Sequence, residues 1–180
     1  MLYAQVVSDE TTVTFLDCHR SAFEYFGGTV EEILYDNAKV VALSRTKEAV
    51  IFNPSLIDFA GIYGFRPIVC KPFRPQTKGK VERSIRYIRD SFLEGEVFLD
   101  LADMQQKLLI WLESVANKRI CSTTGIAPSM LLLSEDLKTL PEIKSSAKTL
   151  INIAKKNSFA IISAPQVQTR NLYSYEECCL

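Results

Sequence analysis

Histidine, tryptophan and long apolar runs are scarce in this sequence. The 180 residues include one histidine and one tryptophan. No stretch approaches the roughly 20 apolar residues that a bilayer-spanning helix needs, which argues against a membrane protein. The opening residues have no basic region ahead of an apolar segment, so the sequence predicts no secretory signal and a cytoplasmic location.

The sequence also lacks the common patterns of metal, redox and covalent-nucleophile sites. Its five cysteines are odd in number and scattered, with no CxxC pair, and we interpret them as reduced thiols. No nucleophilic serine or cysteine arrangement and no phosphate-binding glycine loop is evident. We interpret His19 as a surface or boundary residue of a helix rather than a ligand, and Trp111 as a residue packed between helices.

Charge of one sign does not dominate the composition, yet basic residues are concentrated in one segment. Hydrophobic residues make up 47% and charged residues 23%, with a net charge of zero, as in an ordinary globular domain. Between residues 71 and 89, however, seven basic residues accompany one acid, Glu82. The basic residues are Lys71, Arg74, Lys78, Lys80, Arg83, Arg86 and Arg89.

Apolar spacing and turn residues predict alternating strands and helices. Ser8 and Asp9 are candidate N-caps for the first helix, and Gly27 is its stop signal. Two prolines and a glycine predict a loop over 71–79. The predicted strands are 2–7, 32–35 and 67–70, with short extended pieces over 39–43 and 49–52. The first predicted helix ends near residue 26, and the second runs from Pro54 to Tyr63. Three more are predicted over 80–93, 100–118 and 128–133.

An aspartate at a strand tip and a glutamate on a basic helix form the main candidate site. Asp36 follows the strand 32–35, and Glu82 comes 46 positions later. Strand ends and helix starts of an α/β sheet meet at one edge, where carboxylates can share a hard divalent metal. Metals held in this way activate water and stabilise the leaving oxygen in phosphoryl transfer. Neighbouring basic side chains would hold the phosphodiester backbone.

The residues alone leave simpler readings open. Asp36 can be only a turn residue. Glu82 can be a surface residue that pairs with Arg86 four positions on, which is worth a few tenths of a kcal/mol. The basic segment can be a solvated helix face.

Several ordered motifs over about residues 10 to 135 resemble the transposase core of the IS21 family. The strongest is Pro72 to Arg83, which is similar to the segment that carries the last acid of the DDE motif in that family and in retroviral-type integrases. The other motifs are Phe23 to Gly28, Ile33 to Lys39, Phe52 to Pro54, Asp58 to Ala60, Tyr63 to Pro67, Val115 to Asn117 and Thr123 to Gly125.

The resemblance implies an α/β, ribonuclease-H-like integrase core and metal-dependent DNA cleavage and strand transfer. Asp36 matches the second aspartate and Glu82 the glutamate of the catalytic triad, both as ligands of Mg²⁺ or Mn²⁺. Arg86 and Arg89 match positions where integrases contact the DNA end. The implied partners are DNA, a helper ATPase and other transposase subunits.

The chain departs from the family at its start. The family's first aspartate lies on the first strand of the core, whereas residues 2–7 match a later strand. We therefore expect an N-terminally truncated core that is inactive alone, or alternatively a non-catalytic DNA-binding or partner-binding remnant. Because the family's strand order is 3-2-1-4-5, we expect strand 2–7 to lack its partner and strand 32–35 to expose an edge. The expected division is a partial catalytic core over 1–95, a helical extension over 96–140 and a tail over 141–180.

Overall fold

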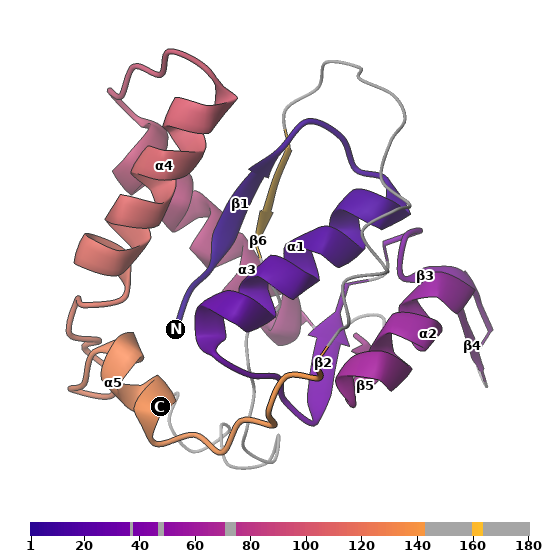
Figure 1. Cartoon of the computed structure of the whole chain (residues 1–180). Coiled ribbons are helices and arrows are strands. Elements are labelled where there is room, and N and C mark those ends of the chain that lie inside the picture. Colours follow the sequence, from indigo (N-terminus) through magenta and orange to yellow (C-terminus); the bar gives the residue numbers. More distant parts are fainter. Residues whose placement is uncertain (37, 47–48, 71–74, 143–159, 164–180) are drawn as a thin grey trace.

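The computed structural model describes residues 1–36, 38–46, 49–70, 75–142 and 160–163 (Figure 1). Strands and helices alternate along most of this length, as the sequence predicts. The strands are β1 (Ala4–Val7), β2 (Glu32–Tyr35), β3 (Ala42–Arg45), β4 (Val50–Phe52), β5 (Arg66–Val69) and β6 (Ala160–Ser163). The helices are α1 (Thr12–Phe26), α2 (Pro54–Tyr63), α3 (Pro75–Ile88), α4 (Leu101–Trp111) and α5 (Pro128–Leu133), with π-helical turns η1 (Arg89–Leu93) and η2 (Leu112–Ala116).

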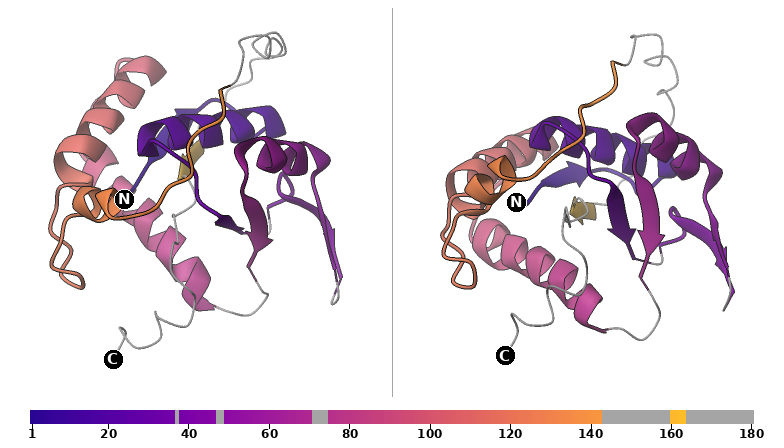
Figure 2. Two further views of the ribbon diagram at one scale, coloured as in Figure 1. Left: turned by 60° about the horizontal axis from the view of Figure 1, so that its bottom comes forward. Right: turned by 90° about the horizontal axis from the view of Figure 1, so that it is seen from below.

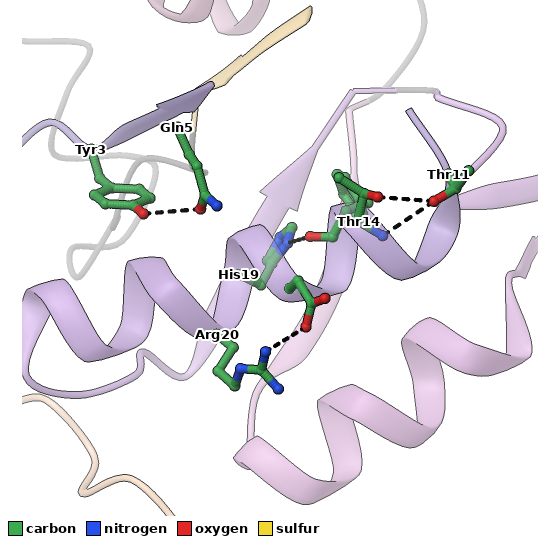
Figure 3. Close-up of polar contacts among 8 residues, drawn as sticks. Tyr3, Gln5, Thr11, Thr14, His19 and Arg20 are labelled. Atoms are coloured by element: carbon green, nitrogen blue, oxygen red, sulfur yellow. Dashed lines mark hydrogen bonds and ion pairs between the residues drawn. The ribbon is translucent and has the colours of Figure 1, made fainter. Parts of the chain in front are cut away.

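Capping residues set the ends of the first two helices. Asn53 accepts a 3.0 Å hydrogen bond from the Ser55 amide and Pro54 opens α2, as predicted. The cap of α1 is Thr11, whose hydroxyl accepts from the Thr14 amide (Figure 3). The prediction of Ser8 or Asp9 as the cap was wrong because Asp9 lies outside the helix. Its carboxylate instead accepts bonds from the Thr11 amide and the Thr14 hydroxyl, at 3.0 and 2.6 Å.

The strands form three two-stranded sheets among the described residues. β2 pairs with β5 in parallel, and β3 pairs with β4 in an antiparallel hairpin. β1 pairs antiparallel with β6, with Val6 opposite Ile161. The expectation that β1 would lack a partner strand was therefore wrong, because a segment far along the chain supplies one. Strand β2 pairs only with β5 within the described part of the chain.

The helices cover the strands from two sides. Figure 2 shows α1 and α2 on one side of the strands and α3 on the other. The larger core lies under α1 and α2, where Phe23, Leu56 and Tyr63 pack against Ile33 and Val69. No helix in the described residues is long and apolar enough to span a membrane.

A second core joins β1 to the later helices. Ala4 of β1 packs with Ile88, Phe92, Leu108 and Leu112, all of them buried. The residues after 96 therefore share a core with the first strand.

Polar side chains from the later helices cover the edge of β1. The Asn117 side-chain oxygen accepts a 2.7 Å hydrogen bond from the Leu2 amide, and its nitrogen donates to the Leu2 carbonyl at 2.8 Å. Gln105 accepts from the Val6 amide at 2.7 Å. Alternate residues of a strand direct their backbone groups to the same edge. The side chains of Asn117 and Gln105 therefore occupy backbone groups that a neighbouring strand would otherwise bind.

Two helical predictions need correction. Helix α3 begins at Pro75, inside the segment predicted as a loop, because proline is tolerated in the first turn, where no intrahelical donor is needed. The predicted buried stripes also break. Ile85 is 40% exposed although Ile88 is buried, and Val115 is 44% exposed although its neighbour Ala116 is buried. In the second case, the wider π-turn η2 shifts the buried face by about one position.

Candidate active site and nucleic-acid interface

The carboxyl ends of β2 and β5 bring Asp36 beside Cys70. Tyr35 lies opposite Val69 in the parallel register, and the Cys70 amide donates a 2.9 Å hydrogen bond to the Tyr35 carbonyl. Asp36 is the next residue after Tyr35, its carbonyl accepts from the Ala38 amide at 2.8 Å, and its side chain is exposed. The prediction that Asp36 stands at the tip of a strand is confirmed. The edge where parallel strands end is where α/β proteins usually place their ligand sites.

Arg45 connects the β3–β4 hairpin to this edge. Its guanidinium Nη1 donates to the Cys70 carbonyl at 2.6 Å. Burial raises the pKa of the Cys70 thiol, the negative charge of Asp36 raises it further, and Arg45 opposes both. Asp36, Arg45 and Cys70 therefore lie within electrostatic reach of one another, although they come from three different parts of the sequence.

Glu82 lies in α3, the helix that follows β5 after the segment 71–74. Its side chain is exposed. Across the residues that the structure describes, no three His, Cys, Asp or Glu side chains gather as a metal-binding group. That Asp36 and Glu82 bind a metal ion together therefore stays a prediction. The described part of the chain adds no third ligand to them.

The predicted DNA-binding residues divide into three groups. Lys71 and Arg74 lie outside the described residues, and Lys78 and Lys80 fall in the first turns of α3. The third group is exposed and consists of Arg83, Arg86 and Arg89. Arg89 contacts Asp90, with its Nε 3.2 Å from the carboxylate. Both side chains of that pair are more than half exposed, so water screens it and it restrains Arg89 weakly.

The buried side of the same helix explains why these arginines face outward. Ile88 and Phe92 lie in the second core. Trp111 contacts Tyr87 and Phe92 at ring-centroid distances of 5.2 and 5.6 Å, which confirms that it packs between helices. A helix fixed by these contacts presents its charged residues to solvent.

His19 is buried, so its assignment to the surface or boundary of α1 was wrong. It is 1% exposed among the rings of Phe15, Phe23, Tyr35 and Phe59. Its Nδ1 is 2.7 Å from the Phe15 carbonyl (Figure 3). Burial lowers the pKa of His19 to about 4, so the ring is neutral at pH 7. Aromatic rings surround this neutral histidine, and the helical periodicity of the sequence did not distinguish its buried position from the boundary of the helix.

Sequence reasoning missed Arg45 and Asn117 as structurally important residues. Arg45 belongs to a short hairpin with no regular pattern, and its partner is a backbone carbonyl 25 positions away. Asn117 was part of a matched motif, which was the available signal, yet nothing in its surroundings indicated a bond to Leu2.

The strands and helices have the fold of an integrase catalytic core domain. The structure is similar to the catalytic core domain of BIV integrase, with a TM-score of 0.52, 21% identity, and coverage of 73% of this chain and 77% of that chain. The ribonuclease-H-like fold expected from the resemblance is confirmed.

Sequence comparison identifies relatives among the transposases of insertion sequences. The chain is 41% identical over 141 residues to a putative transposase of insertion sequence IS5376 from Geobacillus stearothermophilus, covering 78% of this chain and 35% of the relative. It is 36% identical over 124 residues to the transposase of IS21 from Pseudomonas aeruginosa, covering 67% of this chain and 32% of that one. Over the matched residues, the chain is related to the transposases of IS21-type insertion sequences. No family model matches it. The chain spans about a third of the length of these curated relatives.

Proposed function

We propose that the chain is part of a DDE transposase core that acts in DNA transposition and integration by metal-dependent phosphodiester cleavage and strand transfer. The observation that carries the proposal is the position of Asp36 at the carboxyl end of parallel strands in a chain related to IS21-type transposases. Glu82, on the basic helix that follows β5, is the second proposed catalytic carboxylate.

Asp36 and Glu82 fit a hard divalent cation by their donor type. Both carboxylates are exposed and so reachable by an ion from solvent. Mg²⁺ or Mn²⁺, when bound, would polarise a phosphodiester and lower the pKa of an attacking water or 3′-hydroxyl. The residues of this chain would hold the ion with these two carboxylates and keep the strand ends fixed through the Arg45 contact to Cys70.

DNA is the proposed substrate because exposed arginines project from the helix that carries Glu82. Arg83, Arg86 and Arg89 are exposed, and Lys71, Arg74, Lys78 and Lys80 precede them in the sequence. Contacts of this kind bind phosphates without reading bases. We further propose a helper ATPase and other transposase subunits as partners, a cytoplasmic location, and the division into a core over 1–95, a helical extension over 96–140 and a tail over 141–180.

Counting ligands leads us to propose that the chain alone does not catalyse strand transfer. A two-metal reaction needs carboxylates that flank both ions, and this chain offers two at family-equivalent positions. Misplacing the reacting groups by about 1 Å can cost on the order of 100-fold in rate. The purified chain should therefore yield no joined or cleaved transposon-end DNA with Mg²⁺ or Mn²⁺. The Asp36→Asn, Glu82→Gln double variant controls for contaminating nucleases.

A direct assay of metal binding tests the carboxylate pair without relying on activity. Fe²⁺ bound in place of Mg²⁺ and supplied with hydrogen peroxide and ascorbate generates hydroxyl radicals that cut the backbone close to the ion. We expect cuts near residues 36 and 82 in the unmodified chain, with competition by Mg²⁺, and their loss in the double variant. Equal cutting in both proteins would refute the proposed metal site.

A second candidate is a non-catalytic DNA-binding or partner-binding remnant. The absence of a third gathered ligand among the described residues, together with the exposed arginines, favours it. DNA binding unaffected by the double variant, with no Fe²⁺-dependent cutting, would support this candidate over the catalytic one.

A further inference from the structure

Arg119 lies against the basic helix although it is far from it in sequence. It follows η2, and its guanidinium carbon is 4.6 Å from the centroid of the Tyr87 ring in α3. The Tyr87 ring also contacts Trp111, at 5.2 Å between centroids. Tyr87 is thus held in place by its neighbours and in turn holds Arg119 over α3.

The ring contact leaves the arginine able to bind an anion. A guanidinium bound to an aromatic ring uses its π face, whereas phosphate is bound by the N–H groups along its edge. Arg119 is exposed, and among the described residues no carboxylate forms an ion pair with it. Its charge is therefore held at the surface, and no carboxylate of the described residues neutralises it.

The position of Tyr87 places Arg119 beside the arginines of α3. Arg83 and Tyr87 are four positions apart, so they share one face of the helix, and Arg86 is adjacent to that face. Arg83, Arg86 and Arg119 are all exposed. The acidic residues on the same elements are Glu82, Asp90 and Glu113, and Asp90 contacts Arg89. Basic groups from two separate segments therefore meet on one face.

We infer that Arg119 is a further contact for the DNA phosphate backbone and extends the basic face of α3 onto the residues after η2. The inference rests on the proposed function. A face built from arginines on two elements fits a ligand with repeated phosphates, and bidentate N–H groups suit phosphate oxygens. The contact is independent of sequence, because nothing in the arrangement reads a base edge.

The salt dependence of DNA binding tests this contact. The full chain would be titrated into a fluorescein-labelled 20-base-pair duplex of arbitrary sequence at several NaCl concentrations, with binding followed by anisotropy. Losing one phosphate contact makes the slope of log K against log salt shallower by about 0.9. We expect this change for Arg119→Ala. Arg20→Ala is the matched control, because it removes the same charge from α1, where Arg20 pairs with Asp17 at 2.7 Å.

A pair of ring substitutions tests the support that Tyr87 gives. Tyr87→Phe keeps the ring and should leave the slope unchanged. Tyr87→Leu removes the ring and should weaken binding in the same direction as Arg119→Ala, and Arg119→Lys should recover part of the slope. Thermal melts identify any variant that fails to fold. In that case, the slope of Arg119→Lys compared with that of the unmodified chain decides whether Arg119 contacts phosphate.

The outcomes are distinguishable from failure of the proposed function. If the unmodified chain binds DNA and Arg119→Ala has the same slope as Arg20→Ala, the inference is wrong and the proposed function stands. If the unmodified chain binds no DNA at low salt, the DNA-binding proposal and this inference both fall.

Discussion

The side-chain amide of Asn117 pairs with both backbone groups of Leu2, as a neighbouring strand would. It accepts from the Leu2 amide at 2.7 Å, donates to the Leu2 carbonyl at 2.8 Å, and also donates to the Tyr25 hydroxyl at 3.1 Å. Asn117 is 1% exposed, so water cannot replace these bonds. One residue after η2 therefore fixes the beginning of the chain against α1.

Replacing Asn117 with alanine should lower the free energy of unfolding by about 2 to 4 kcal/mol, because the part-buried backbone groups of Leu2 lose their partner. Urea denaturation followed by circular dichroism measures the change. Gln105→Ala is the matched control, since it removes a single bond to Val6 and should cost less. Equal losses in the two variants would contradict the special role of Asn117.

Blocking β6 should make the chain associate. Ile162→Pro removes a backbone donor opposite Gln5, whose backbone groups face β6 because those of the next residue, Val6, face Gln105. The freed edge of β1 would then be open to other chains. Size-exclusion chromatography with light scattering should show a larger species for this variant than for the unmodified protein. A variant that keeps the mass of the unmodified chain would mean that β6 does not protect this edge.

Acid should destabilise the fold through His19. Its folded pKa is lowered to about 4 from an ordinary 6.5, so the unfolded chain takes up a proton that the folded chain does not. The stability from the neutral ring is complete above pH 6.5 and is lost as pH falls toward 4, by up to roughly 3 kcal/mol. His19→Phe should flatten this part of the curve of unfolding free energy against pH. An unchanged slope in that variant would assign the acid sensitivity to other groups.

Arg45 should hold the end of β5 in place. Arg45→Ala removes the 2.6 Å bond to the Cys70 carbonyl and should speed amide hydrogen exchange around residues 69 and 70 without changing exchange in α4. Exchange read by mass spectrometry on peptides distinguishes the two regions. Arg45→Lys keeps one donor and should restore part of the protection. Uniform acceleration across the protein would indicate global destabilisation instead.

Local sequence signals predicted the elements with strong caps. Gly27 ends α1, and Asn53 with Pro54 begins α2, because these residues satisfy or tolerate the unpaired backbone groups at helix ends. The placement of Asp36 after β2 followed from the same reasoning, since polar turn residues end strands. These features depend on neighbours in sequence.

The features that sequence did not predict depend on contacts made at long range. The pairing of β1 with β6, the burial of His19 and the Arg45 contact each need partners that no periodic pattern identifies. Pro75 was read as a loop residue because proline suits both loops and first helical turns. The π-turn η2 shifted the buried face from Val115 to Ala116, and a pattern based on 3.6 residues per turn does not anticipate that shift.

The bonds that complete β1 have a consequence for synthesis on the ribosome. Gln105 and Asn117 lie 99 and 115 positions after their partners, and β6 is later still. At about 5 to 20 residues per second, the first strand waits on the order of 10 s before any of these groups has been made. Strand β1 thus leaves the ribosome well before the groups that complete it. A nascent chain stalled before residue 105 would expose it throughout the stall.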